Sequence, residues 1–215
     1  MSKLLTLLIL GCVCAGANAQ VYVSSSMGAT MNMKADLSLT AAGNSTDIGH
    51  VEIEGDVKYD VELGYNFKDA GFIRSFYFEY SEHENEINLN TDLGATLGFT
   101  SAELDQEYYL FGLRLGPKES NGLSDILPYI TIGLGSLDAD LSTNLGSGDE
   151  SVKVLKTGLG HTYDAGEGFS IFTEYNYVYT WGLDIDTSAF KEYPNDTITG
   201  KMTYHMLSIG FALEL

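Results

Sequence analysis

The stretch "VEIEGDVKYDVELGYNF" (residues 51–67) alternates two chemistries and decides the fold class. Its odd positions are apolar or aromatic apart from Gly55, whereas most of its even positions carry a charge. Successive side chains of a β-strand point to opposite faces. The stretch therefore predicts one long strand over 51–67. Its odd, apolar face would contact one environment, and its even, charged face would contact another.

Segments of the same kind recur along the chain. They are rich in Val, Ile, Tyr, Phe and Thr and are bounded by clusters of Gly, Asn, Asp and Ser, which is typical of strands and turns. Eight strands are predicted, at 20–34, 51–67, 72–87, 105–116, 127–139, 151–164, 168–181 and 199–215.

The predicted connections alternate in length. Those after the first, third, fifth and seventh strands are long and polar: 35–50, 88–104, 140–150 and 182–198. The others are mostly short. An even number of antiparallel strands with long loops at one end and tight turns at the other is the plan of a bacterial outer-membrane barrel, whose turns lie in the periplasm. We therefore expect an all-β, eight-stranded, antiparallel up-and-down transmembrane barrel.

The N-terminal residues have the pattern of an export signal. Lys3 precedes an apolar run, and Ala17-Asn18-Ala19 fits the small-x-small cleavage rule. We expect a signal peptide at 1–19 and a barrel domain at 20–215, located in the outer membrane of a Gram-negative bacterium. A lipoprotein signal with an acylated Cys12 is the alternative, although its apolar run would be short. Both cysteines lie inside the predicted signal, so the mature chain is expected to lack disulfides.

Charge and hydropathy exclude some classes of protein. Lys and Arg number 11 against 30 Asp and Glu, a net charge of −19. Nucleic acid is therefore not an expected partner, because its binding needs a basic surface. No run long enough for a transmembrane helix follows the signal, but barrel strands are only about ten residues of alternating hydropathy. A soluble β-sandwich or lipocalin-like barrel would also alternate; it would turn its apolar face inward and expose the glycines.

The apolar faces are expected to contact outer-membrane lipid and lipopolysaccharide. In the strand predicted at 105–116, for example, Phe111 and Leu113 would face lipid, while Gly112 and Arg114 would line a narrow interior. Aromatic residues near the two interfaces of a barrel form girdles. The predicted girdle and lipid-facing residues are Tyr59, Tyr65, Tyr109, Tyr175, Tyr177, Tyr179 and Trp181.

The interior charges are the strongest functional feature of the sequence. Strand alternation places the following residues inside: Glu54, Asp56, Lys58, Asp60, Glu62, Glu79, Arg114, Lys156 and Glu174. Unpaired buried charges are costly, so a salt-bridged, hydrated plug is the first interpretation. The second is a gate whose opening gives a narrow, cation-preferring pathway. Because side chains fill eight-stranded barrels, a wide porin is not expected.

Three segments resemble a known family. "LPYITIGLG" (127–135), "GLGHTYDAGEGFSIFTEYNYVY" (158–179) and "HMLSIGFALEL" (205–215) are similar to strands of small outer-membrane barrels of the opacity-protein and OmpA-transmembrane-like group. The resemblance covers nearly all of the mature chain, and its loose motifs indicate the architecture of the chain more than its activity. It also implies that the last strand is read by the barrel-assembly machinery. The family usually ends in an aromatic residue, whereas this chain ends in Leu215, which bears on assembly efficiency.

Enzymatic and metal chemistry have weak candidates. His205 and Ser208 are the nearest approach to an esterase pair, but their odd spacing puts them on opposite faces of a strand. An omptin-like protease would need a larger barrel. Possible metal donors are Glu82, His83, Glu84 and Glu86, and the pairs Asp138/Asp140 and Asp184/Asp186. Solvated loop charge is the preferred interpretation of these acids. We expect no catalytic residues, no metal and no cofactor.

The long loops indicate the remaining class of function, which is ligand binding. They are rich in Gly, Asn, Ser, Thr and Asp, and include the apolar residues Leu93, Leu97, Phe99 and Phe190. Loops on a rigid scaffold are where binding usually lies, so adhesion to a host or cell-surface ligand is the alternative function. The expected function is thus a structural or surface-antigen barrel, with a narrow gated pore as a variant of it and a lipid-modifying enzyme as a remote alternative.

Overall fold

A computed structural model describes residues 19–41, 44–53, 55–67, 72–87, 102–117, 126–143, 147–186 and 197–215. Within these ranges all regular structure is β. The strands are β1 (Ala19–Ala41), β2 (Asn44–Ile53), β3 (Val57–Phe67), β4 (Ile73–Ile87), β5 (Ala102–Leu115), β6 (Ile126–Thr143), β7 (Ser147–Gly166), β8 (Phe169–Trp181), β9 (Leu183–Asp186) and β10 (Thr197–Glu214). The described residues contain no helix that could cross a membrane.

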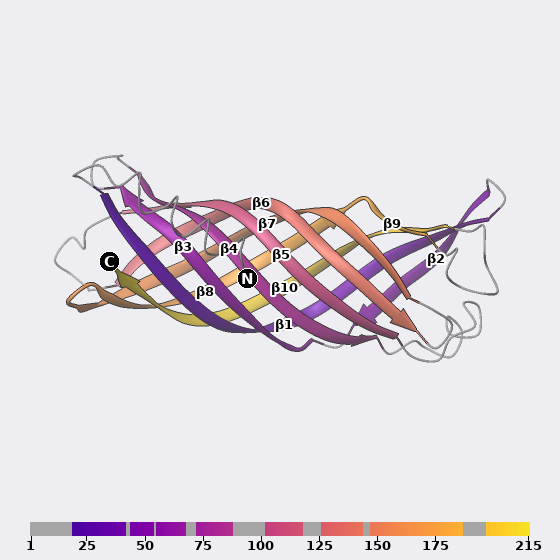
Figure 1. Cartoon of the computed structure of the whole chain (residues 1–215), viewed down its shortest axis with the longest axis horizontal. Helices are drawn as coiled ribbons and strands as arrows, with labels where there is room; N and C mark the ends of the chain where they lie inside the picture. The colour runs from indigo at the N-terminus through magenta and orange to yellow at the C-terminus, as the bar shows by residue number, and fades with distance from the viewer. Residues whose placement is uncertain are drawn as a thin grey trace.

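Eight of these strands close an antiparallel barrel, as predicted. The hydrogen-bonded order is β1-β3-β4-β5-β6-β7-β8-β10, and pairing of β1 with β10 completes the ring. Figure 1 shows the strands wrapping around one long axis with a strong tilt. Strand tilt and stagger are what allow a sheet of this size to close on itself.

The two ends of the barrel differ. At one, here called the turn end, residues 167–168 join β7 to β8, and the amide of Leu215 donates to the carbonyl oxygen of Val21 (2.8 Å). At the other, here called the loop end, β2 pairs with β1 and β9 with β10. These pairs form ribbons that extend the barrel (Figure 1). Parts of the predicted loops 35–50, 88–104, 140–150 and 182–198 are strand, a correction to the sequence-based bounds.

The two faces of the barrel are divided as the alternation predicts. In β3, Tyr59 and Val61 are exposed, whereas Lys58, Asp60 and Glu62 are buried. In β10 the outward set is Leu207, Ile209, Phe211 and Leu213. A belt of large apolar side chains thus covers the outside, as a lipid-facing surface requires. A soluble barrel would have the reverse arrangement.

The strand predicted over 51–67 is interrupted, and its faces switch at the interruption. Ile53 is buried, whereas Val57 is 44% exposed, although both belong to the odd set predicted to face lipid. The neighbouring strand β1 switches its faces at the same level. Asn32 has a φ of 50°, and the pairing of β1 with β10 shifts register there. A residue in this left-handed conformation breaks the alternation of a strand. The prediction that Ile53 faces lipid is therefore wrong.

Close contacts between β1 and residues 55–56 stabilise the interruption between β2 and β3. The amide of Asp56 donates to Thr30 Oγ1 (2.8 Å), and the amide of Thr30 donates to the carbonyl oxygen of Asp56 (3.0 Å). Gly55 lies so close to β1 that an added Cβ would be 1.9 Å from the carbonyl oxygen of Thr30. Only glycine allows this approach of two backbones.

Candidate functional site

The charged residues of the barrel interior form one continuous ion-pair chain. Lys58 Nζ lies 3.0 Å from Asp60 Oδ1 and 3.6 Å from Glu79 Oε1. Lys156 Nζ then connects Glu79 Oε2 (2.6 Å) to Glu174 Oε1 (3.4 Å). Opposite charges alternate along this path, so each buried cation has two carboxylate partners. Such pairing offsets the cost of removing the charges from water.

Arg114 continues the chain to Glu62. Its Nη1 and Nη2 donate to Glu62 Oε1 (2.6 Å) and Oε2 (2.8 Å), a bidentate pair, and Nη2 lies 3.7 Å from Glu174 Oε2. Tyr22 completes the group, because its hydroxyl donates to Glu62 and accepts from Arg114 Nη1 (2.8 Å). Bidentate arginine–carboxylate pairs are among the strongest charge-assisted hydrogen bonds. The described interior chain contains four carboxylates and three cations.

Four aromatic rings surround the Arg114 guanidinium. Its Cζ lies 5.0 to 6.0 Å from the ring centroids of Tyr22, Tyr77, Tyr129 and Phe172. A guanidinium within about 6 Å of an aromatic face is attracted to it electrostatically. The rings and the ion pairs together fix Arg114 across the barrel.

Each of these rings lies over a glycine of the neighbouring strand. The directly paired residues are Tyr22 with Gly64, Tyr77 with Gly112, Tyr129 with Gly160 and Phe172 with Gly210. A Cβ added to Gly64 or Gly112 would come within 2.1 or 2.3 Å of the ring. The glycines thus make room for rings in a narrow interior. Sequence reasoning missed this set; an aromatic residue opposite an inward glycine is the signal that would have found it.

The structure brings most of the predicted interior charges together. Lys58, Asp60, Glu62, Glu79, Arg114, Lys156 and Glu174 all belong to the chain described above. Asp56 does not: it precedes β3, is exposed, and accepts from the amide of Val57 (2.6 Å). Its predicted interior position is wrong because the faces switch at this break. Glu54 lies outside the described residues.

The predicted girdle residues all point away from the interior. Tyr59 is 61% exposed, and the others are exposed or half-buried on the outer face: Tyr65, Tyr109, Tyr175, Tyr177, Tyr179 and Trp181. Several stack with neighbours, as Tyr179 does with Trp181 (5.7 Å between centroids). Stacking of this kind holds amphipathic rings in fixed positions on the outer surface.

The weak enzymatic and metal candidates are separated by strand alternation. His205 points outward and contacts the Tyr175 hydroxyl (2.6 Å), whereas Ser208 is buried inside the barrel. Glu82 and Glu84 face outward and His83 inward; Asp138 and Asp140 both face outward. Among the described residues no cluster of three or more such side chains could hold a metal ion. The apolar loop residues Leu93, Leu97, Phe99 and Phe190 lie outside the described part.

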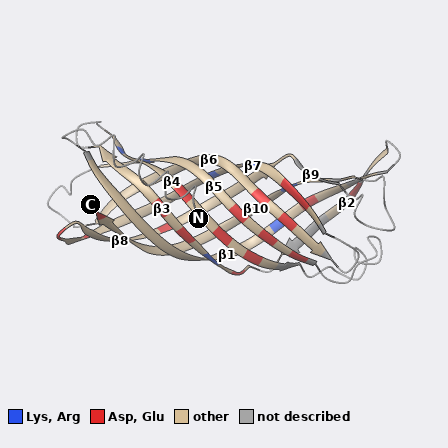
Figure 2. Ribbon diagram, viewed as in Figure 1, with Lys and Arg blue, Asp and Glu red and all other residues tan. Residues whose placement is uncertain are grey.

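The outer surface of the loop-end half is acidic. Glu82 of β4 is paired with Glu107 of β5, which in turn is paired with Asp138 of β6. Figure 2 shows acidic residues on these strands toward the loop end. Like charges directly opposite each other across a sheet are destabilising.

An apolar cluster occupies much of the interior of the same half. Fifteen buried residues form one cluster there, among them Met33, Leu104, Leu137, Met202 and Met206. Polar side chains on the inward face near it include His83, which stacks on Tyr108 (5.5 Å between centroids). The interior is thus filled by an ion-pair chain and, beyond it toward the loop end, by an apolar cluster with buried polar side chains such as Asn85 and Gln106 beside it.

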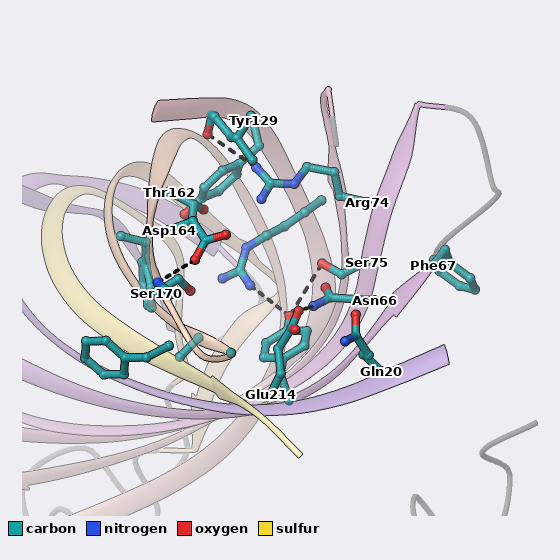
Figure 3. Close-up of a pocket in the computed structure, with 18 of the residues that line it drawn as sticks. Gln20, Asn66, Phe67, Arg74, Ser75, Tyr129, Thr162, Asp164, Ser170 and Glu214 are labelled. Carbon is teal, nitrogen blue, oxygen red and sulfur yellow. Dashed lines mark hydrogen bonds between the residues drawn. The ribbon is translucent and has the colours of Figure 1, made fainter. Parts of the chain in front are cut away.

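A cavity of about 600 Å³ opens at the turn end. Its walls include Tyr22, Arg74, Arg114, Tyr129 and Phe172, so the ring-enclosed Arg114 forms part of its boundary. Figure 3 shows polar residues from several strands converging on this space. We call it the turn-end cavity.

Comparison with known proteins agrees with this architecture. The sequence profile of the family described as "Outer membrane protein beta-barrel domain" matches residues 5–213. The chain belongs to this family. Membership confirms the predicted fold and the likeness to small outer-membrane barrels, and it places the protein in the outer membrane. A search of curated proteins gave no match.

Solved structures of other barrels of the outer membrane share the fold. The AlkL outer membrane protein has a TM-score of 0.56 at 16% identity, over 94% of this chain and 92% of its own. OprG from Pseudomonas aeruginosa has a TM-score of 0.51 at 16% identity, over 93% and 98%. Neisserial surface protein A has a TM-score of 0.50 at 13% identity, over 92% and 99%. At these identities the likeness concerns the fold.

Proposed function

We propose that this protein is a non-enzymatic structural barrel of the outer membrane that is closed to ions and holds its loop end rigidly at the cell surface. The observation that carries the proposal is the filled interior. Between the turn-end cavity and the loop end, the described side chains form an ion-pair chain followed by an apolar cluster, with buried polar residues such as His83, Asn85 and Gln106 beside it. Eight-stranded barrels generally have interiors just wide enough for side chains.

The apolar cluster is a barrier that the ion pairs alone would not provide. An ion that entered from the turn end would have to shed water to pass buried side chains such as Leu137 and Met202. Hydrophobic constrictions close pores by excluding water, and an unsolvated ion in such a region is costly. Opening the barrel would therefore require both the ion-pair chain and the apolar cluster to rearrange.

The narrow cation-preferring gate is the second candidate, and one observation favours it. The ion-pair chain has four carboxylates against three cations, so a pathway that opened through it would attract cations. The gate proposal requires a second state in which Arg114 or Lys156 leaves its partners. The four rings around Arg114 oppose such a movement.

Adhesion through the loop end is the alternative from a different class. The β1–β2 and β9–β10 ribbons extend the barrel beyond its closed part, and the surface around it is acidic. A ligand bound there would have to tolerate or complement negative charge, which weighs against anionic glycans at low salt. Replacing the segments between strands at the loop end would abolish adhesion and leave the barrel folded.

Cation flux through vesicles separates these functions. The protein is reconstituted into vesicles loaded with a potassium-sensitive dye, with heat-modifiable gel mobility as the control for folding. We expect flux equal to that of protein-free vesicles. Flux that rises with protein content and disappears on unfolding would support the gate instead.

A further inference from the structure

The turn-end cavity has the volume of a small-molecule site and a largely polar lining. Its volume is about 600 Å³, and its polar walls include Gln20, Asn66, Ser75, Thr162 and Ser170. Cavities of roughly 300–1,000 Å³ with a few convergent polar groups are typical of ligand sites. Because Arg114 and its rings bound the inner side, a molecule in this space would be bound and not passed on toward the loop end.

Arg74 supplies a cation that forms no ion pair with the described residues of the barrel. Its side chain is half-buried in the cavity wall, and Nη1 donates to the carbonyl oxygen of Leu127 (3.3 Å). Within the described ranges no carboxylate forms an ion pair with it, in contrast to Arg114 and Lys156. A guanidinium has five N–H donors in a planar fork that matches a carboxylate. Among the described residues, the Leu127 carbonyl oxygen is the one hydrogen-bond acceptor of this guanidinium, which Figure 3 shows at the cavity wall.

Tyr129 holds this guanidinium in place. The Arg74 Cζ lies 5.4 Å from the Tyr129 ring centroid, and the Arg114 Cζ lies 5.2 Å from the same centroid. Two cations therefore share one ring at the cavity wall. Arg114 forms ion pairs with Glu62 and Glu174, whereas none of the described carboxylates pairs with Arg74, and an anion beside Arg74 would be stabilised.

Carboxylates line other walls of the same cavity. Asp164 Oδ1 accepts from the amide of Gly166 (2.8 Å), and Glu214 Oε1 accepts from Asn66 Nδ2 (2.9 Å). Figure 3 shows Asp164 and Arg74 both directed into the space. One wall thus offers an unmatched cation and another offers carboxylates with a single hydrogen bond each. A molecule with charges of both signs fits this lining better than a plain anion does.

We propose that the turn-end cavity binds a small zwitterion, an amino acid or short peptide, with its carboxylate on Arg74 and its ammonium group toward Asp164 and Glu214. The proposal does not depend on the closed-scaffold function, because the cavity and the loop end lie at opposite ends of the barrel. It adds a binding site at the end that faces the periplasm in the expected orientation.

The test measures binding of trialanine to the refolded full barrel in detergent by saturation-transfer NMR. We expect saturable binding that weakens at least about tenfold when the peptide carboxylate is replaced by an amide, the loss of one charge-assisted pair. Arg74→Gln should weaken trialanine binding to a similar degree. Arg74→Lys keeps the positive charge and loses the planar guanidinium, so its affinity for trialanine should lie between those of Arg74→Gln and the native protein.

Matched controls make the result decisive. Lys201→Gln removes one positive charge at the loop end, where Lys201 pairs with Asp36 (3.3 Å), and should leave binding unchanged. N-acetyl-trialanine should bind more weakly than trialanine to the native protein, and this difference should shrink in Asp164→Asn. Equal binding of both peptides would overturn the zwitterion assignment. No binding at about 10 mM, or equal binding to Arg74→Gln, would overturn the site itself.

Discussion

Lys156 of β7 contacts Glu79 of β4 across the barrel interior, with 2.6 Å between Nζ and Oε2. These strands are not neighbours in the sheet, so the pair ties opposite walls together without any backbone pairing. Glu79 also lies 3.6 Å from Lys58 Nζ. One carboxylate therefore stands between two buried cations.

Replacing Glu79 is expected to destabilise the barrel strongly. Glu79→Gln leaves Lys58 and Lys156 with one carboxylate partner each, so the free energy of unfolding should fall by about 3 kcal/mol. Urea unfolding in lipid vesicles, followed by gel mobility, measures the change. Glu84→Gln, on the exposed face of the same strand, should stay within about 0.5 kcal/mol of the native protein. Similar losses in the two variants would contradict the interior network.

The glycines beneath the rings should not tolerate a methyl group. An alanine at Gly112 would place its Cβ 2.3 Å from the buried Tyr77 ring, so we expect a loss of about 1–3 kcal/mol. In Gly112→Ala combined with Tyr77→Leu, the clash should be partly relieved, which a double-mutant cycle detects. Gly133→Ala is the comparison variant: its added Cβ would lie 3.3 Å from the Tyr77 hydroxyl, so its loss of stability should be smaller than that of Gly112→Ala. Additive effects of Gly112→Ala and Tyr77→Leu would argue against the ring–glycine contact.

The switch of faces in β1, beside the gap between β2 and β3, should depend on the residue at position 32. Asn32 has a φ of 50°, a conformation that β-branched residues strongly disfavour. Asn32→Val should therefore lower stability by about 1–2 kcal/mol, whereas Asn32→Gly should be neutral or slightly stabilising. Chemical unfolding of the two variants compares them directly. A valine variant as stable as the glycine variant would show that the left-handed residue is not required.

The acidic outer surface should make the barrel sensitive to salt. Glu107 lies between Glu82 and Asp138 on neighbouring strands, and its side chain accepts from the Tyr109 hydroxyl (2.8 Å). Glu107→Gln keeps an acceptor and removes one repelling charge, so at low salt it should stabilise by about 0.2–1 kcal/mol. The gain should vanish near 1 M salt, where the screening length is about 3 Å. A gain that is independent of salt would exclude charge repulsion as its cause.

Much of the fold could be predicted because strand alternation is a local property. Eight strands and most of their faces followed from residue order, and Lys58, Asp60 and Glu62 lie inside as expected. The lengths of the connections did not, because strands extend into the predicted long loops. The faces on either side of Asn32 could not be predicted, since one left-handed residue reverses the alternation beyond it. Asp56 and Ile53 were misplaced for this reason.

The partners within the interior could not be predicted from the chain alone. Which carboxylate meets Lys156 depends on the stagger of strands around the closed barrel, and Glu79 is 77 residues away in sequence. The turn-end cavity depends on the same closure, because Arg74 and Asp164 come from distant strands. The residue types predicted a network of interior charges, and barrel closure determined which of these charges pair with one another.

Single-channel recording from the refolded barrel in planar lipid bilayers tests the central claim most directly. The native protein and Arg114→Ala should both be silent, because the apolar cluster around Leu137 remains in place in each. A variant that replaces Leu137, Met202 and Met206 by serine together with Arg114→Ala should conduct and so serve as the positive control. Discrete, cation-selective steps from the native protein would contradict the closed interior.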